Sequence, residues 1–190
     1  MRVIAGTAKA TRLVAPPSMH VRPTLDRVKT AMFNLLRDRV EGAMVLDIFS
    51  GSGSLGIEAL SRGAASCVFV ELTKSCLDAI DGNLEKAHLF KRARVIRGDV
   101  FKIWRRLPAD ATFDLVLAAP PYRMVNDAST RERLWQWFAQ LVGGETFAAD
   151  GLIMLEHRRQ RSPLAFPAEL AVFDARTYGD TTLSLLVKRS

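Results

Sequence analysis

The sequence contains few residues of the kind that build covalent or metal-bound frameworks. Its 190 residues include two cysteines and three histidines. The spacing of Cys67 and Cys76 matches no metal or redox motif, and the histidines are scattered along the chain. We therefore expect both cysteines to be reduced thiols, as in a cytosolic protein, and we expect no metal site.

Long apolar runs are also missing. No stretch approaches the roughly 18 residues that span a bilayer, and no basic segment followed by an apolar run marks a secretory signal at the N-terminus. The hydrophobic fraction of 48% is ordinary for a folded chain. These features predict a cytoplasmic protein with no membrane partner. We expect one domain over residues 1–190, with an N-terminal extension (1–41) on a catalytic core (42–190).

Acidic residues are scarce at the start of the chain. Residues 1–41 carry eight basic and three acidic side chains, whereas the other 149 residues carry 19 basic and 17 acidic ones. A basic arm beside a nearly neutral body favours a polyanionic partner such as nucleic acid, because phosphate contacts supply affinity without sequence choice. The alternative is a solvated surface that happens to be basic.

Short apolar runs alternate with helical patterns after residue 43. Strands are expected at 44–49, 67–71, 93–97, 113–118 and 152–156, and helices at 55–62, 72–87, 101–107 and 130–142. This alternation predicts a doubly wound, mainly parallel α/β sheet of the Rossmann-like type. Strands near 171–177 and 182–188 are too close for a helical crossover and predict an antiparallel edge hairpin. Residues 1–15 favour a small hairpin, and 24–37 a helix.

A glycine-rich turn follows the first strand. Gly51-Ser52-Gly53-Ser54-Leu55-Gly56 fits G-x-G-x-x-G and opens a helix. Glycine is expected there because a ligand lies against the backbone. Glu71, twenty residues after Gly51, is placed to accept both hydroxyls of a ribose. The context predicts a ligand that contains a nucleoside.

Three features favour S-adenosylmethionine over a dinucleotide. Asp47 precedes Gly51 by four residues and is similar to the methionine-side signature of S-adenosylmethionine enzymes. Asp99 is placed to accept from an adenine amino group, although it also fits a helix N-cap. No second domain is left for a dehydrogenase substrate site. The expected cofactor-binding residues are Asp47, Phe49, Ser50, Gly51, Gly53, Leu55, Glu71, Leu72, Asp99, Val100 and Ala118.

A second motif ends the fourth strand. Ala119-Pro120-Pro121-Tyr122 resembles the D/N-P-P-Y/F turn of methyltransferases that modify exocyclic amino groups of bases. Such an amine is a poor nucleophile, and two acceptors that hold its N–H groups aim its lone pair at the methyl group. In those enzymes the acceptors are the Asp or Asn side chain and the first proline carbonyl, and the aromatic ring stacks on the base.

This chain departs from that motif, because Ala119 stands in place of the acid or amide. Pro120 keeps its carbonyl and Tyr122 its ring. Losing a comparable hydrogen-bonding group costs on the order of 10²–10³ in rate. Asp114 is a poor substitute, since it begins the same strand about 17 Å away at ~3.4 Å per residue. Binding of the cofactor is therefore a firmer expectation than turnover, unless another residue supplies the acceptor.

The wider sequence resembles the RsmD family of 16S ribosomal RNA guanine-N2 methyltransferases. The resemblance rests on residues 1–6, 22–28, 33–34, 46–53, 55–64 and 176–180 and covers nearly the whole chain. It implies S-adenosylmethionine as cofactor, S-adenosylhomocysteine as product, catalytic positions Ala119, Pro120, Pro121 and Tyr122, and small-subunit RNA or the assembled particle as partner of a monomer. It also implies RNA contacts or pocket closure by Lys9, Arg12, Arg22, Thr24 and Arg27, of which Thr24 could instead start a helix.

Three other functions stay open at this point. The chain could be a catalytically disabled relative that binds S-adenosylmethionine and RNA. A nucleic-acid adenine-N6 methyltransferase shares the turn chemistry, but 190 residues leave little room for a target-recognition domain. A dehydrogenase is the least favoured, and cofactor titration separates it from the others.

Overall fold

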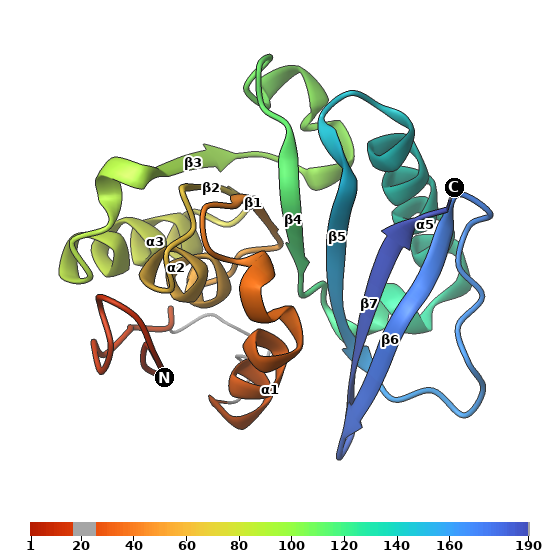
Figure 1. The fold of residues 1–190 in the computed structure, drawn as a ribbon, viewed down its shortest axis with the longest axis horizontal. Helices are drawn as coiled ribbons and strands as arrows, with labels where there is room; N and C mark the ends of the chain where they lie inside the picture. The colour runs from red at the N-terminus through yellow and green to blue at the C-terminus, as the bar shows by residue number, and fades with distance from the viewer. Residues whose placement is uncertain (17–25, 190) are drawn as a thin grey trace.

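Seven strands form one twisted sheet in the computed structural model, which describes residues 1–16 and 26–189 (Figure 1). The strand order is β3-β2-β1-β4-β5-β7-β6. The strands β1 to β5 pair in parallel, whereas β7 runs antiparallel to both β5 and β6. The strand bounds are β1 Met44–Ile48, β2 Ser66–Glu71, β3 Ala93–Arg97, β4 Phe113–Ala118, β5 Phe147–Arg158, β6 Leu170–Tyr178 and β7 Thr181–Lys188.

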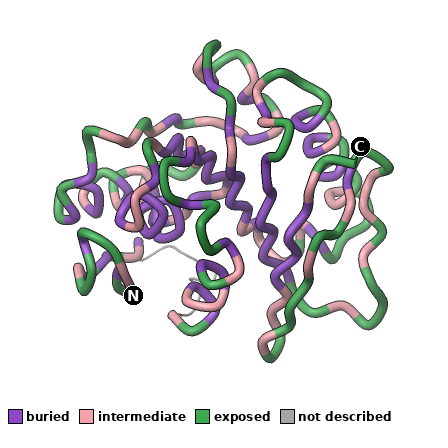
Figure 2. Tube along the Cα trace, viewed as in Figure 1, coloured by how far each residue is buried: buried purple, intermediate pink, exposed green. Residues whose placement is uncertain are grey.

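Helices cover both faces of this sheet, so the core has two layers. One apolar cluster joins the sheet to α1, α2 and α3, and the other joins it to α5 and to the 3-10 turns that follow β3. Successive residues of β1 alternate between the clusters, with Val45 in the first and Leu46 in the second. Both faces of the strand are therefore buried, which is why it reads as a continuous apolar run. Figure 2 shows the central strands buried along most of their length.

The helix bounds are α1 Asp26–Leu36, α2 Ser54–Ser61, α3 Lys74–Lys86, α4 Tyr122–Asn126 and α5 Ala128–Gly143, and the 3-10 turns are η1 Arg37–Arg39, η2 Phe90–Arg92, η3 Val100–Lys102 and η4 Trp104–Arg106.

The Rossmann-like arrangement and the C-terminal hairpin are confirmed, with differences in detail. The helix expected over 101–107 is two 3-10 turns, η3 and η4, and Pro108 follows the second after one residue, Leu107. The strand expected over 152–156 is longer, because β5 begins at Phe147 and continues to Arg158. The short helix α4 was not anticipated, since five residues are too few to show a helical period. Within the hairpin it is β7, the later strand, that pairs with β5, which leaves β6 at the edge.

The N-terminal segment forms the expected hairpin-like turn. Arg2 and Arg12 make an isolated antiparallel bridge, and Val3 N donates to the Thr11 carbonyl at 3.0 Å. The helix expected over 24–37 is present from Asp26 to Leu36, and residues 24 and 25 lie outside the described residues. Within residues 1–16 and 26–189, no helix has both the length and the apolar character that crossing a membrane needs.

Candidate cofactor and substrate site

The glycine-rich turn joins β1 to α2 through backbone in the left-handed region. Phe49, Gly51 and Gly53 have φ values of 57°, 55° and 76°. For a bulky residue such as Phe49 this conformation costs on the order of 1–3 kcal/mol. Such strain is typical of a backbone that is shaped for a ligand.

Gly56 is required by protein packing rather than by a ligand, and Gly53 by its left-handed backbone. A Cβ on Gly56 would lie 2.3 Å from the Phe69 ring, so this glycine lets α2 approach β2 closely. A Cβ on Gly53 would meet Ile80 at 3.2 Å. The sequence-based explanation, a ligand lying against the backbone, therefore does not account for Gly53 and Gly56.

Asp47 brings a buried carboxylate to the turn. Its Oδ2 accepts from Gly56 N at 2.9 Å, whereas Oδ1 is a buried acceptor without a hydrogen-bond partner among the described residues. Burial raises the pKa of this carboxyl to about 7, the bond from Gly56 N opposes the rise, and the charge of Glu71 adds to it. An unpaired buried acceptor is costly, and a cationic ligand group would satisfy it.

Glu71 ends β2 beside the same turn. Its carboxylate accepts from Gly51 N at 2.9 Å, from Leu72 N at 2.8 Å and from Thr73 N at 2.9 Å. An ionised carboxylate offers about four acceptor positions, so three are used by the backbone. A ribose that takes both hydroxyl bonds from Glu71 must therefore replace one of these contacts. The same contacts fix the carboxylate in place.

Asp99 has the capping role that its position also suggested. Its Oδ1 accepts from Phe101 N at 3.0 Å at the start of η3, and the residue also lines the cavity described next. The second oxygen of the carboxylate can still accept a hydrogen bond, so capping and ligand binding are compatible.

A cavity of about 530 Å³ lies at the carboxyl ends of β1, β2 and β4. Its volume is typical of a small-molecule site. Nine of the eleven expected cofactor residues line it, whereas Gly53 and Ala118 do not. Several lining residues were not foreseen from the sequence. Ser52 and Ser54 lie inside the glycine motif but were not singled out, and nothing in the local sequence marks the others: Met1, Val70, Thr73, Cys76, Gly98, Phe101, Arg123, Met124 and Arg133.

The Pro-Pro-Tyr turn reaches the same cavity. Ala119 and Pro121 line it, whereas Pro120 and Tyr122 do not. The Tyr122 phenol pairs with the Thr181 hydroxyl at 2.9 Å and donates to Glu156 Oε1 at 3.3 Å. These bonds tie the start of α4 to β5 and β7. Asp114 lies at the other end of β4, where its Oδ2 accepts from Met44 N at 2.8 Å.

A buried ion pair behind the glycine turn was not foreseen from the sequence. Lys29 Nζ lies 3.6 Å from Glu58 Oε2, and both side chains are fully buried. Burial lowers the pKa of Lys29, and the charge of Glu58 opposes this. Lys29 also donates to the Arg2 carbonyl at 2.6 Å and to Ser54 Oγ at 3.1 Å. Glu58 accepts from Ile4 N at 2.7 Å, so the pair fastens the N-terminal segment and α1 to α2.

The expected RNA-binding residues are placed only in part. Lys9 and Arg12 are exposed on the N-terminal turn, and Arg27 is exposed on α1. Arg22 and Thr24 lie outside the described residues. The described ranges contain no cluster of three or more His, Cys, Asp or Glu side chains that could hold a metal ion.

The fold is that of the Rossmann-like, S-adenosylmethionine-dependent methyltransferases. A family model described as "Conserved hypothetical protein 95" matches residues 1–187. The chain belongs to this family, the RsmD family.

Curated relatives cover nearly the whole chain. It is 33% identical to YlbH of Bacillus subtilis, provisionally named an rRNA methyltransferase, over all of both chains. It is also 33% identical to ribosomal RNA small subunit methyltransferase D of Escherichia coli, over 97% of this chain and 88% of that protein.

Solved structures show the same architecture. An Escherichia coli protein provisionally described as a methyltransferase superposes with a TM-score of 0.79 at 27% identity, over 99% of this chain and 97% of that one. A hypothetical protein of Thermus thermophilus gives the same TM-score at 30% identity, over 100% and 99%.

Proposed function

We propose that this protein transfers a methyl group from S-adenosylmethionine to the exocyclic N2 of a guanine in small-subunit ribosomal RNA, as free RNA or in the assembled particle. One observation carries the proposal. The glycine-rich turn lines the same cavity as Ala119 and Pro121, so a cofactor and a base amine can meet there. The names of the curated relatives support ribosomal RNA as the substrate.

The residues of the cavity fit the proposed cofactor. S-adenosylmethionine carries an ammonium and a sulfonium charge, and the unpaired Asp47 Oδ1 is a buried acceptor for a cationic group. Glu71 and Asp99 stand at the ends of β2 and β3, where they can hold the ribose and adenine. When bound, the cofactor supplies an electrophilic methyl group on sulfur.

The protein's part in the reaction is to position the base. The Pro120 carbonyl accepts one N–H of the amine, and the Tyr122 ring stacks on the base. With the cofactor bound, the methyl group would pass to N2 as its bond to sulfur breaks, which would leave S-adenosylhomocysteine, and the amine would lose one proton to solvent. Ala119 offers no second acceptor, so we propose that transfer is slow in this chain relative to one with Asp at this position.

The test compares methyl transfer by the wild type and Ala119→Asp, with labelled S-adenosylmethionine and small subunits that lack the modification. We expect label at guanine N2, with a higher rate for the Asp variant. Equal rates would mean that another group supplies the acceptor. Cofactor binding without transfer by either protein would refute the RNA assignment and favour a binding module.

A further inference from the structure

Four arginines gather beside the Pro-Pro-Tyr turn (residues 119–122), which is the candidate base-binding turn. Arg131 of α5 and Arg158, Arg159 and Arg161, at and after the end of β5, line a cavity of about 620 Å³ together with Asn126, Gln160, Ser162, Pro163, Leu164 and Ala165. We call these four residues the β5 arginine cluster. The lining contains no acidic residue, so the cavity presents only positive charge and neutral polar or apolar groups.

The cluster adjoins the residues of the proposed reaction. Asn126 ends α4, the helix that begins at Tyr122, and lies about 6 Å along its axis at ~1.5 Å per residue. Arg158 is two residues after Glu156, which contacts the Tyr122 phenol. The cavity therefore opens next to the position where the target base would stack.

The backbone under the cluster is fixed by hydrogen bonds. Arg159 N donates to the Asp180 carbonyl at 2.7 Å, in the turn between β6 and β7. The side chain of Gln160 supports the segment as well: its Nε2 donates to Asn126 Oδ1 at 2.8 Å and to the Arg158 carbonyl at 2.9 Å. The arginines are thus presented from an anchored segment, which lowers the ordering cost of binding.

Three of the guanidinium groups are available to a ligand, whereas Arg131 is half-buried and its Nη1 donates to the Val125 carbonyl at 3.1 Å. Arg158, Arg159 and Arg161 are exposed, and among the described residues no carboxylate forms an ion pair within 4.0 Å of any of the four. The neighbouring acid Asp127 uses its carboxylate to accept from Thr130 N at 2.9 Å. Guanidinium groups bind phosphate oxygens in a bidentate way, which makes arginine suited to RNA backbones.

From this arrangement we infer that the β5 arginine cluster binds RNA phosphates next to the target guanine. The inference rests on the proposed function, which makes RNA the substrate. It adds a contact surface to the N-terminal basic segment. Figure 1 shows that segment and the connection after β5 on opposite sides of the molecule, with the carboxyl ends of β4 and β5 between them. An RNA strand held at both sides would cross the candidate base-binding turn.

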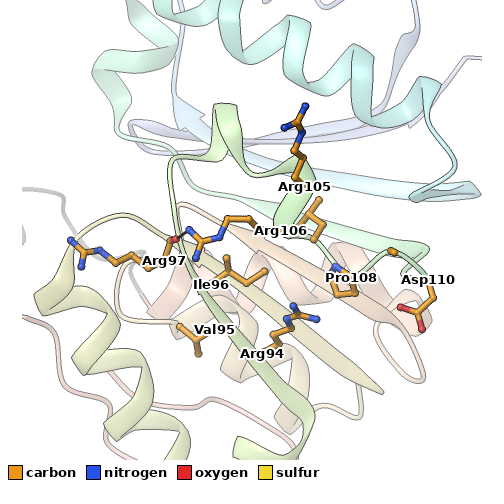
Figure 3. A pocket seen from close by; sticks show the side chains of 10 residues that line it. Arg94, Val95, Ile96, Arg97, Arg105, Arg106, Pro108 and Asp110 are labelled. Atoms are coloured by element: carbon orange, nitrogen blue, oxygen red, sulfur yellow. Dashed lines mark hydrogen bonds between the residues drawn. The ribbon is translucent and has the colours of Figure 1, made fainter.

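A second basic hollow offers a matched control. Arg94, Arg97, Arg105 and Arg106 line a cavity of about 460 Å³ along β3, together with Asp110 (Figure 3). Arg106 donates to the Arg97 carbonyl, and Figure 3 shows Arg97 and Arg105 pointing in different directions. Three strand spacings separate β3 from β4, or about 14 Å at ~4.8 Å each, so this hollow is remote from the turn.

The experiment measures RNA binding by three double variants. Arg159→Gln/Arg161→Gln removes two charges from the cluster, Arg94→Gln/Arg105→Gln removes two from the remote hollow, and Arg159→Lys/Arg161→Lys keeps the cluster charge. The probe is full-length small-subunit ribosomal RNA transcribed in vitro, titrated at several salt concentrations. Thermal melting and S-adenosylmethionine titration check that each variant folds and keeps its cofactor site.

We expect the cluster glutamine variant to bind RNA on the order of tenfold more weakly and its salt slope to fall by about 1.5, the value for two lost phosphate contacts. The remote variant should change affinity less than threefold. The lysine variant should keep the slope and recover part of the affinity. Equal losses in the two glutamine variants, or no loss in either, would overturn the inference. The assay measures RNA binding independently of methyl transfer. A wild type that binds RNA through the cluster but methylates no RNA would therefore refute the proposed function and leave this inference standing.

Discussion

The Asp47→Asn variant tests two properties of this buried carboxylate: how far it destabilises the folded protein, and whether it binds the cofactor. Burial raises the pKa of Asp47 from 3.8 to about 7. Between these values the native state keeps a proton that the unfolded chain has released. The free energy of unfolding therefore falls as pH rises through this window, by about 1.4 kcal/mol per pH unit. The loss amounts to about 4 kcal/mol in total and is complete above pH 7.

Asparagine keeps an acceptor for Gly56 N and cannot ionise. The variant should match the wild type in stability near pH 4 and exceed it by up to about 4 kcal/mol at pH 8, without ligand. The assay is urea unfolding of both proteins from pH 4.5 to 8. Parallel stability curves for the two proteins would refute the reasoning, because they would mean that Asp47 has a similar pKa in the folded and unfolded chains.

The protonation of the Asp47 carboxylate should change when the ligand binds. A cationic group at Oδ1 favours the ionised form, so S-adenosylmethionine binding at pH 6 should release nearly one proton. Calorimetry in two buffers of different ionisation enthalpy measures this release. Asp47→Asn should bind the cofactor more weakly and release no such proton. A wild type that takes up no cofactor at any pH would contradict the assignment of the cavity.

Three further changes test the surrounding structure. Ala119→Asp should raise the methyl-transfer rate by on the order of 10²–10³ in a single-turnover assay, and an unchanged rate would show that the position does not matter. Tyr122→Ala should raise the KM for RNA by about 10- to 100-fold through lost stacking, whereas Tyr122→Phe should keep most of the affinity. Lys29→Met should lower the free energy of unfolding by about 1–3 kcal/mol in urea, since the Arg2 carbonyl and Ser54 lose their donor. Glu58 loses this cation but keeps Arg62 Nε at 2.7 Å, so its charge stays compensated.

The core of the fold could be predicted because its signals are local. The runs at 44–48 and 113–118 are apolar on both faces, and the helices between them carry apolar residues at helical spacing. The order of the last strands could not be predicted, because a hairpin can pair with β5 through either of its strands. The helix at Tyr122–Asn126 was also hidden, since one short turn has too few residues to show a period.

The residues of the candidate site likewise could be predicted from the sequence only in part. The glycine turn, Asp47, Glu71 and Asp99 lie on the ends of strands, and the carboxyl edge of a parallel sheet brings such residues together. Met1 and Arg133 reach the cavity from distant parts of the chain. The Lys29–Glu58 pair could not be foreseen, because helix periodicity does not show that α2 is covered by the N-terminal segment. The glycine at 56 was explained by the wrong neighbour, because the sequence does not show that Phe69 of β2 packs against it.

Ala119 has to be weighed against what surrounds it. Glu156 brings a carboxylate to this turn. Ala118 of β4 pairs with Leu155 of β5, and the next residues along the two chains are Ala119 and Glu156. Glu156 accepts from the Tyr122 phenol, so its described contact orients the aromatic ring. The groups that would bind cofactor and RNA are present, whereas one acceptor for the amine is missing at its expected position. Binding and turnover are therefore separable in this chain. Restoring one carboxylate at position 119 should change the rate of transfer and leave the affinities for cofactor and RNA nearly as they are.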